Sequence, residues 1–290
     1  MTAAKPPAYG RMLAFPTVAI RFPFPGKSIA QSFLPAASRV LVWQSTDVVL
    51  SAAVAFLSGV RGLGWSPRLA QDAALAAEWT RRANDFVVID AGANVGSWTA
   101  EFRKLVTGRG RIYAFEPQPQ AAAKIRELCV RDCEVVELAL GRQPGTLAFY
   151  TAGPADTMGS LFQRHDTYAA NRRYEQFDVK VIRLDDFVKA NHIDRIDFMK
   201  MDLEGAELEA LNGAIECMRT GALRALSFEF GISDVNARVF FRDFFDLFSQ
   251  YRYEISRLTP GGRLIRVSDY SEDLEVFART TSYFARKIDS

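Results

Sequence analysis

The stretch that most constrains the fold of this chain is FVVIDAGANVGSWT, which spans residues 86–99. Residues 86–89 and Ala91 are apolar and rich in β-branched and aromatic types, which predicts a fully buried strand. The strand carries one carboxylate, Asp90, near its carboxyl end. Ligands of open parallel sheets bind outside the carboxyl ends of the strands. The stretch therefore predicts the floor of a small-molecule site directly after this strand.

The turn after the strand has the pattern D-x-G-x-N-x-G, formed by Asp90, Gly92, Asn94 and Gly96. Glycine adopts positive φ and lets a ligand approach the backbone, Asn tolerates the left-handed region, and Ser97 is expected to cap the helix that follows. A dinucleotide loop instead reads G-x-G-x-x-G, with its glycines against a pyrophosphate. A carboxylate ahead of the first glycine suits a ligand with an ammonium group, for which S-adenosylmethionine is the natural candidate. The alternative is a tight turn without a ligand.

The next predicted strand ends in a second carboxylate. Residues 111–115 form a buried run followed by Glu116 and Pro117, and Glu116 lies 26 residues after Asp90. In nucleotide-binding folds, an acidic residue about 20 positions further along the chain meets a ribose diol. The two carboxylates at neighbouring strand ends thus predict contacts with opposite ends of one nucleoside ligand. The alternative for Glu116 is a surface acid before a turn.

Strand patterns and helix patterns alternate along the rest of the chain. The predicted strands are residues 134–140, 146–151, 177–184, 196–201, 224–230, 253–258, 264–267 and 282–287. The predicted helices are residues 67–82, 98–105, 120–131, 206–219 and 236–250. The last helix has a phenylalanine stripe that predicts core packing or, as the alternative, an oligomer interface. This order predicts an α/β fold with a doubly wound, Rossmann-like sheet and an antiparallel edge strand.

Two regions depart from this alternation. Residues 1–65 read as a Pro-rich basic arm (residues 1–27) followed by apolar helices, and residues 66–290 as the α/β domain. Residues 1–70 hold seven Lys and Arg against one acid, a net charge of +6, which predicts contact of residues 1–27 with an anionic surface; solvated charge is the alternative. Within the domain, residues 146–184 hold a long segment without clear periodicity, which we expect to fold over the ligand as a substrate-selecting lid.

The composition is that of an ordinary globular protein, with 49% hydrophobic and 24% charged residues among 290. The three cysteines form no CxxC pair, which predicts reduced thiols and no zinc site. Pro and Arg interrupt every apolar run before residue 28, so no secretory signal is predicted, and residues 48–60 are too few to span a bilayer. We therefore expect a cytoplasmic protein, peripheral to a membrane if the arm binds one.

Together these motifs resemble those of the FkbM-type methyltransferases. VVIDAGANVGSWT, YAFEPQP, VVELALG, VIRLDDF and IDFMKMDLEGAELEALNG match over about residues 86–230 in the family's order, whereas residues 1–65 match nothing in it. The resemblance implies a seven-stranded methyltransferase sheet, here with an N-terminal helical extension. It also implies S-adenosylmethionine as cofactor and O-methylation of a hydroxyl on a sugar, glycan or natural product. The predicted cofactor contacts are Asp90, Gly92, Asn94, Gly96, Ser97, Glu116, Pro117, Ala139, Leu140 and Asp202.

Methyl transfer from a sulfonium requires an aligned acceptor oxygen, and a weakly acidic hydroxyl benefits from a general base or a metal. Asp202 ends the fourth core strand, beside the turn, and is the first candidate for the base. Glu204 and Glu229 are second candidates, as base or as ligands of acceptor hydroxyls, and His165 in the lid is a further one. Lys200 shares a strand face with Asp202 and could pair with it instead. Asp202 and Glu204 could hold Mg²⁺, although no metal site is assigned.

Two other classes of function compete with this reading. One is a cofactor-binding module without turnover that docks on an anionic surface through its basic N-terminus. The other is an NAD-linked oxidoreductase, which the missing third glycine of the loop disfavours. We expect a small-molecule or glycan acceptor as the partner, and nucleic acid is not expected.

Overall fold

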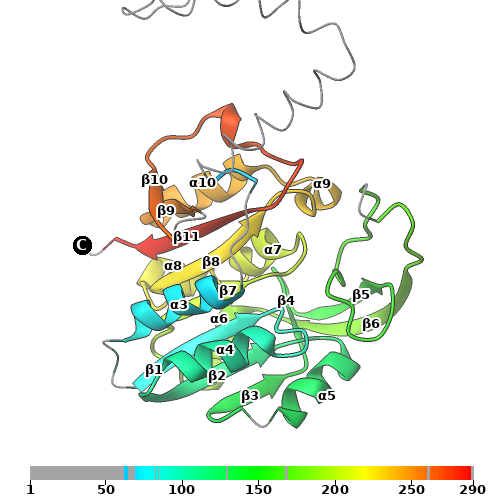
Figure 1. Ribbon diagram of the computed structural model, residues 1–290, viewed down its shortest axis with the longest axis horizontal. Coiled ribbons are helices and arrows are strands. Elements are labelled where there is room, and N and C mark those ends of the chain that lie inside the picture. Colours follow the sequence, from blue (N-terminus) through cyan, green and yellow to red (C-terminus); the bar gives the residue numbers. More distant parts are fainter. Residues whose placement is uncertain are drawn as a thin grey trace, which may run out of the picture. The chain divides into compact units, whose positions relative to one another are not determined.

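The computed structural model describes residues 62–64, 69–81, 83, 85–128, 130–166, 169–259 and 262–288. The predicted arm of residues 1–27 and the apolar segment of residues 48–60 lie outside these ranges. Helices and strands alternate from α3 to β3, and runs of consecutive strands or helices follow further along the described part of the chain (Figure 1). Within that part, none of the helices combines the length and the apolar character that crossing a bilayer requires.

An eight-stranded sheet forms the centre, in the order β10-β9-β11-β8-β7-β1-β2-β3. β1 pairs in parallel with both β2 and β7, so the strand order reverses between β1 and β7. This confirms the predicted doubly wound, Rossmann-like α/β sheet. The strands are β1 (Asp85–Ala91), β2 (Arg109–Phe115), β3 (Cys133–Val136), β7 (Phe198–Met201), β8 (Ala225–Phe230), β9 (Tyr253–Leu258), β10 (Leu264–Val267) and β11 (Thr281–Lys287).

Two details of the sheet differ from the prediction of seven strands with an antiparallel edge. The antiparallel strand β11 lies inside the sheet, where it pairs with β8 on one side and β9 on the other. The eighth strand is β10, which pairs with β9 as the second strand of a hairpin. Since β11 occupies the other side of β9, β10 is left at the edge.

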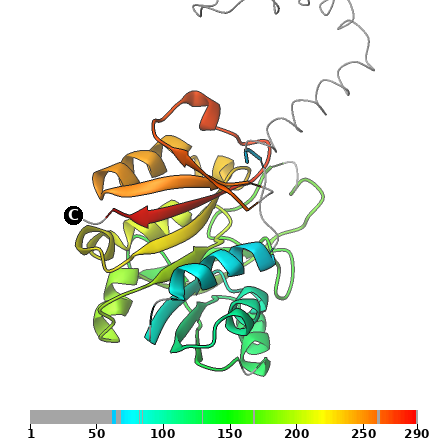
Figure 2. The same ribbon diagram turned by 60° about the vertical axis from the view of Figure 1, so that its left-hand side comes forward.

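Helices cover both faces of the sheet (Figures 1 and 2). Both faces need cover because successive side chains of a strand point to opposite faces and are apolar here. In β1, Val88 packs in a cluster with Trp98 and Phe102 of α4, whereas Ile89 belongs to the larger cluster on the other face. Burying one such side chain contributes roughly 1.5–3 kcal/mol. The first face carries α3 (Leu69–Thr80), α4 (Ser97–Leu105) and α5 (Pro119–Glu127). The second carries α6 (Leu184–Ala190), α7 (Glu207–Asn212), α8 (Ile215–Thr220) and α10 (Phe241–Gln250).

The predicted strand 134–140 is two strands in two sheets, so its continuity was wrong. β3 ends at Val136, and β4 (Ala139–Leu140) pairs instead with β6 (Glu175–Ile182). β6 in turn pairs with β5 (Gly145–Thr151), and the three strands form a separate sheet in the order β4-β6-β5. The segment predicted to be a lid therefore contains two paired strands that belong to a sheet of their own.

The predicted helices 206–219 and 236–250 are likewise each broken in two. Gly213 ends α7, and a Cβ at this residue would overlap the main-chain oxygen of Gly141, which approaches closely here. The second break lies after α9 (Asp234–Ala237), at Arg238, whose φ is 58°. The phenylalanine stripe of α10 packs into the core through Phe241, Phe244 and Phe248, as predicted. Phe240 precedes the helix and is 55% exposed.

Candidate active site

A cavity of about 360 Å³ lies at the carboxyl ends of β1, β2, β7 and β8. It is therefore next to the point where the strand order reverses, which is where ligands bind in doubly wound sheets. Its volume is in the range of small-molecule sites. Its walls come from the turn after β1, the end of β2, the segment around β4, the residues after β7 and several residues between 156 and 161.

The turn after β1 has the left-handed backbone that its residues predict. The φ angles of Gly92, Asn94 and Gly96 are 75°, 47° and 78°. A Cβ on Gly92 would overlap the main-chain oxygen of Asp202, so glycine is required where β7 ends against the turn. Gly92, Asn94 and Ser97 line the cavity, and Gly96 does not. The predicted capping by Ser97 was wrong, because Gly96 is the N-cap of α4 and Ser97 is its first residue.

Glu116, at the end of β2, is buried and lines the same cavity, as does Pro117. Its Oε2 accepts a hydrogen bond from the main-chain N–H of Asn94 at 2.9 Å, and its Oε1 accepts one from that of Gln118 at 2.8 Å. Burial raises the pKa of the Glu116 carboxyl, and these two hydrogen bonds oppose the rise. Each oxygen keeps a further lone pair. The carboxylate can therefore accept two hydroxyl donors, as a ribose diol requires.

An apolar wall of the cavity comes from the second sheet. Ala139 and Leu140 of β4 are buried and line the cavity, together with Leu138 before them and Phe149 of β5. Apolar surface of this kind suits an aromatic ring such as adenine. The structure thus places both predicted adenine contacts on the cavity that Glu116 lines.

Asp90 is not among the residues that line the cavity, and it is fully buried. Thr99 Oγ1 donates a hydrogen bond to its Oδ2 at 2.6 Å, and Lys200 Nζ lies 3.2 Å from its Oδ1. Lys200 Nζ also donates to the main-chain oxygen of Gly92 at 2.9 Å and lies 3.7 Å from Asp202 Oδ2. One ammonium group therefore ties the carboxylate of β1, the turn after it and the end of β7 together.

Of the predicted base candidates, Asp202, Glu204 and Glu229 line the cavity and His165 does not. The Asp202 side chain is 45% exposed. Glu229 Oε1 accepts a hydrogen bond from Ser282 Oγ at 3.2 Å. His165 is exposed, and its main-chain N–H donates to Asn236. The structure thus brings the three carboxylates together and leaves the histidine outside.

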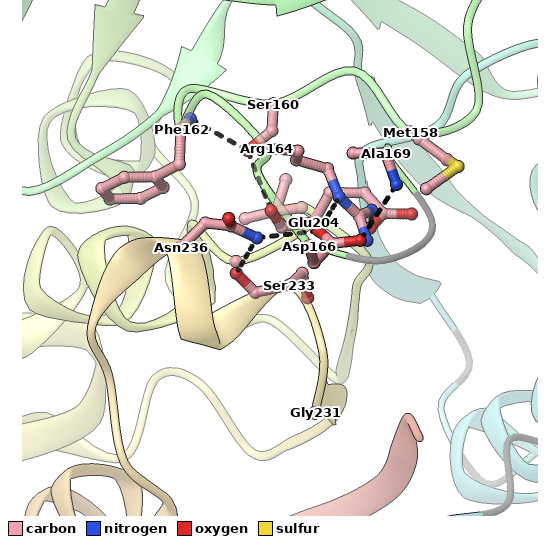
Figure 3. A network of polar contacts seen from close by, with 12 residues as sticks. Met158, Ser160, Phe162, Arg164, Asp166, Ala169, Glu204, Gly231, Ser233 and Asn236 are labelled. Carbon is pink, nitrogen blue, oxygen red and sulfur yellow. Dashed lines mark hydrogen bonds and ion pairs between the residues drawn. The ribbon is translucent and has the colours of Figure 1, made fainter. Parts of the chain in front are cut away.

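Glu204 is held by the predicted lid (Figure 3). Arg164, whose side chain is 2% exposed, places Nη1 2.6 Å from Glu204 Oε2 and Nε 2.8 Å from Asp166 Oδ2. Ser160 Oγ donates to the main-chain oxygen of Glu204 at 2.8 Å, and Asn236 Nδ2 donates to Asp166 at 2.9 Å. Burial, together with the charge of neighbouring carboxylates, raises the pKa of Glu204 well above its ordinary value. The Arg164 guanidinium acts in the opposite direction.

The segment predicted to be a lid is also joined to the turn after β1, and two of the joining residues, Gln118 and Asp156, were not singled out by the sequence patterns. The Gln118 amide donates to the main-chain oxygen of Asp156 at 3.0 Å and accepts from its N–H at 3.1 Å. Asn94 Nδ2 donates to the same oxygen at 3.0 Å, and Arg172 pairs with the Asp156 carboxylate at 2.5 Å. Gln118 lies in the motif YAFEPQP, but Asp156 lies in a run without periodicity.

Asp72 of α3 also lines the cavity and was likewise not predicted. It is a single acid in the first turn of an Ala-rich helix, and such a position has no motif that marks it.

The described side chains around the cavity do not form a set of donor groups that could hold a metal ion. Among the described residues, no group of three or more His, Cys, Asp or Glu is placed to hold a metal ion. Glu204, one of the two predicted Mg²⁺ ligands, is bound by Arg164.

Known proteins similar to this chain share its central part. The chain is 30% identical over 146 residues to 2-O-methyltransferase NoeI of Sinorhizobium fredii, which is 46% of this chain and 59% of that protein. It is 26% identical over 181 residues to hexuronic acid methyltransferase AglP of Haloferax volcanii, 60% of this chain and 66% of that protein. It is 27% identical over 147 residues to Methyltransferase 1 of Beauveria bassiana, 45% of this chain and 59% of that protein.

The aligned parts thus span 59–66% of these relatives' lengths. Among solved structures, precorrin-6y C5,15-methyltransferase of Geobacter metallireducens has a TM-score of 0.38 at 14% identity, over 74% of this chain and 87% of that one. The sequence model described as "Methyltransferase FkbM domain" matches residues 90–255, more than half of the chain. The resemblance inferred from the motifs is confirmed, and the chain belongs to the FkbM methyltransferase family.

Proposed function

We propose that this chain transfers the methyl group of S-adenosylmethionine to a hydroxyl group of a sugar, glycan or natural product. The observation that carries the proposal is the placement of Glu116. Its carboxylate is fixed by two main-chain N–H groups in a cavity at the switch point of the sheet, beside the turn after β1. Family membership supports the same conclusion.

The cavity offers groups that fit the parts of this cofactor. Glu116 would accept hydrogen bonds from the ribose hydroxyls, and Ala139 and Leu140 would contact the adenine ring. Gly92 and Asn94 would contact the amino acid end. Glu116 being buried supports this assignment, because a buried carboxylate that gains two hydroxyl donors replaces the hydration it has lost.

The names of two relatives support an oxygen acceptor on a carbohydrate. One is a 2-O-methyltransferase and the other acts on a hexuronic acid, which is a sugar acid. A second feature supports a polyhydroxylated acceptor. The acceptor side of the cavity presents the carboxylates of Asp202, Glu204 and Glu229, which accept hydrogen bonds and do not donate them when ionised.

S-adenosylmethionine, when bound, supplies a methyl group attached to a sulfonium. Once the methyl group is transferred, the sulfur is left as a neutral thioether. The chain's own residues therefore need to align the acceptor oxygen, exclude water and remove one proton. We assign proton removal to Asp202, which lines the cavity and is accessible to an acceptor. Lys200 holds the Asp202 carboxylate in place at 3.7 Å. Glu229 would orient a second hydroxyl, whereas Glu204 is engaged by Arg164.

The test is incubation of the full chain with S-adenosylmethionine and a panel of neutral glycosides, hexuronates and hydroxylated natural products. We expect S-adenosylhomocysteine to form with at least one panel member, together with that acceptor's mass increased by one methylene unit. Glu116→Gln should lower turnover by weakening cofactor binding. Arg142→Gln, which removes a surface pair with Glu209, serves as the matched control and should leave turnover unchanged.

Two outcomes would contradict the proposal in different ways. Binding of S-adenosylhomocysteine without turnover on any class of the panel would favour the cofactor-binding module. Absence of any binding, measured by calorimetry with the pure protein, would overturn the cofactor assignment itself.

Chelation with EDTA during the same assay tests the Mg²⁺ hypothesis. We derive no step through a metal, because the donor groups of the described residues do not fit one.

A further inference from the structure

Asp72 enters the cavity from α3, a helix outside the motifs that mark the site. Its Oδ2 accepts a hydrogen bond from Trp98 Nε1 at 2.7 Å and another from Ser227 Oγ at 3.3 Å. Trp98 lies in the first turn of α4 and Ser227 on β8, and both also line the cavity. These two donors fix the carboxylate, while Oδ1 has no donor in the described part of the chain. Asp72 thus lines the cavity with one carboxylate oxygen that the described residues leave without a donor.

The charges around this oxygen are not balanced. Lys200 is the cation that lines the cavity in the described part of the chain, and its ammonium lies against Asp90 and Asp202. No Lys, Arg or His of the described residues forms an ion pair with Asp72. Three carboxylates thus surround one ammonium group, which leaves an excess of negative charge at this end of the cavity. The charge of Lys200 stabilises the ionised Asp72 carboxylate without forming an ion pair with it. A buried carboxylate without a paired cation is costly, and a bound cation would lower that cost.

Asp90, the acid predicted to meet an ammonium group, is not available for it. Thr99 and Lys200 engage its two oxygens, and it does not line the cavity. The neighbouring first turn of α4 has main-chain N–H groups without carbonyl partners in the helix, as every helix does, and these suit a carboxylate. A zwitterionic amino acid group would therefore find an acceptor for its ammonium and donors for its carboxylate on adjacent elements.

We propose that Asp72, oriented by Trp98 and Ser227, binds the α-ammonium group of the cofactor's amino acid end. This inference rests on the proposed function, since it names the ligand of one part of the same cofactor. We assign the ammonium rather than the sulfonium to Asp72, because only the ammonium has N–H groups that can donate a hydrogen bond to Oδ1. Burial raises the pKa of the Asp72 carboxyl, and a cation placed against it would act in the opposite direction.

The experiment is calorimetric binding of three ligands to the full chain: S-adenosylhomocysteine, its deamino analogue and 5′-methylthioadenosine, which lacks the amino acid end. Asp72→Asn keeps the shape and an acceptor for Trp98. We expect it to weaken S-adenosylhomocysteine about 10- to 100-fold, the range for a hydrogen bond to a charged group, and to leave 5′-methylthioadenosine within about twofold. Glu116→Gln is the matched control and should weaken both ligands.

The deamino analogue keeps the test decisive even if the variant folds poorly. On the wild-type chain this analogue should bind about 10- to 100-fold more weakly than S-adenosylhomocysteine, and on Asp72→Asn the two should bind alike. If the wild type binds S-adenosylhomocysteine and Asp72→Asn binds it equally well, the assignment of Asp72 is wrong while the proposed function stands. If the wild type binds none of the three ligands, the proposed function itself fails.

Discussion

At the scale of single residues, Lys200 is the side chain that connects β1, the turn after it and the end of β7. Its ammonium contacts the carboxylates of Asp90 and Asp202 and the main-chain oxygen of Gly92. Burial lowers its pKa, but the neighbouring carboxylates outweigh burial and raise the pKa above the ordinary value. The residue is therefore charged at neutral pH, where it neutralises the carboxylates beside it.

Replacing Lys200 tests this neutralisation. We expect Lys200→Met to destabilise the fold by about 3–5 kcal/mol, because it leaves Asp90 as a buried charge without a cation. Urea denaturation followed by circular dichroism measures the loss. The double variant Lys200→Met with Asp90→Asn should recover part of it, because the uncompensated charge is gone. Equal stability of the single variant and the wild type would show that the pair contributes nothing.

Asp234 sets a pH dependence of stability. It is fully buried, its Oδ2 accepts from the Gly231 N–H, and its Oδ1 has no partner in the described structure. Burial, with the charges of Glu204 and Glu229, raises its pKa from 3.8 to about 7. Between these values the folded state binds more protons than the unfolded state, so this group makes stability fall as the pH rises through that window. Glu204 and Glu207, whose pKa values are also raised, act in the same direction.

Asp234→Asn removes the ionisation while keeping an acceptor for Gly231. We expect the variant to gain stability relative to the wild type as the pH rises, and its advantage at pH 8 to exceed that at pH 5 by about 2–3 kcal/mol. Melting temperatures at the two pH values provide the comparison. Asp246→Asn, on the exposed side of α10, is the control and should show no such difference between the two pH values. A stability gain at pH 5 as large as that at pH 8 would contradict the assignment.

At the scale of elements, the sequence predicted those elements whose pattern is local. β1, β2, α4 and β7 follow from apolar runs and glycine turns, and they carry Glu116, Gly92 and Asp202 to one cavity. The misjudged boundaries depend on distant contacts. α7 ends at Gly213 because the chain at Gly141 packs against it, and β4 leaves the main sheet because β6 offers it a partner. Neither contact can be inferred from residues nearby in sequence.

The segment predicted to be a lid is held by Glu204 through Arg164 and by Gln118 through Asp156, and the contact with Glu204 can be tested. We expect Arg164→Gln to speed hydrogen exchange in residues 158–166, because Glu204 and Asp166 would lose their shared guanidinium. Affinity for S-adenosylhomocysteine should change less than about threefold, because Gln118 and Asn94 still hold Asp156. Arg142→Gln is the matched surface control. Unchanged exchange in residues 158–166 would show that the order of this segment does not depend on the pair.

At the scale of the whole molecule, the sheet order decides which predictions about the site succeed. The switch point between β1 and β7 brings together the ends of four strands, so residues predicted at those ends meet, as Glu116 and Asp202 do. Side-chain direction was not predictable in the same way. Asp90 lies on the face of β1 that meets α4, where Thr99 and Lys200 engage it, and Asp72 reaches the cavity from a helix with no motif. Packing between elements determined both.

Charge is distributed unevenly along the chain, and this predicts that residues 1–27, which lie outside the described ranges, contact an anionic surface. Residues 1–70 have a net charge of +6, and since the chain as a whole has +2, the remainder has −4. Removing residues 1–27 takes away Lys5, Arg11, Arg21 and Lys27 and no acid. We expect the shortened chain to sediment less with anionic phospholipid vesicles than the full chain, and the difference to shrink at high salt because screening weakens charge attraction. Neutral vesicles are the control, and S-adenosylhomocysteine affinity should be the same for both chains. Equal sedimentation of the two with anionic vesicles would mean that the basic residues of the arm are solvated charge.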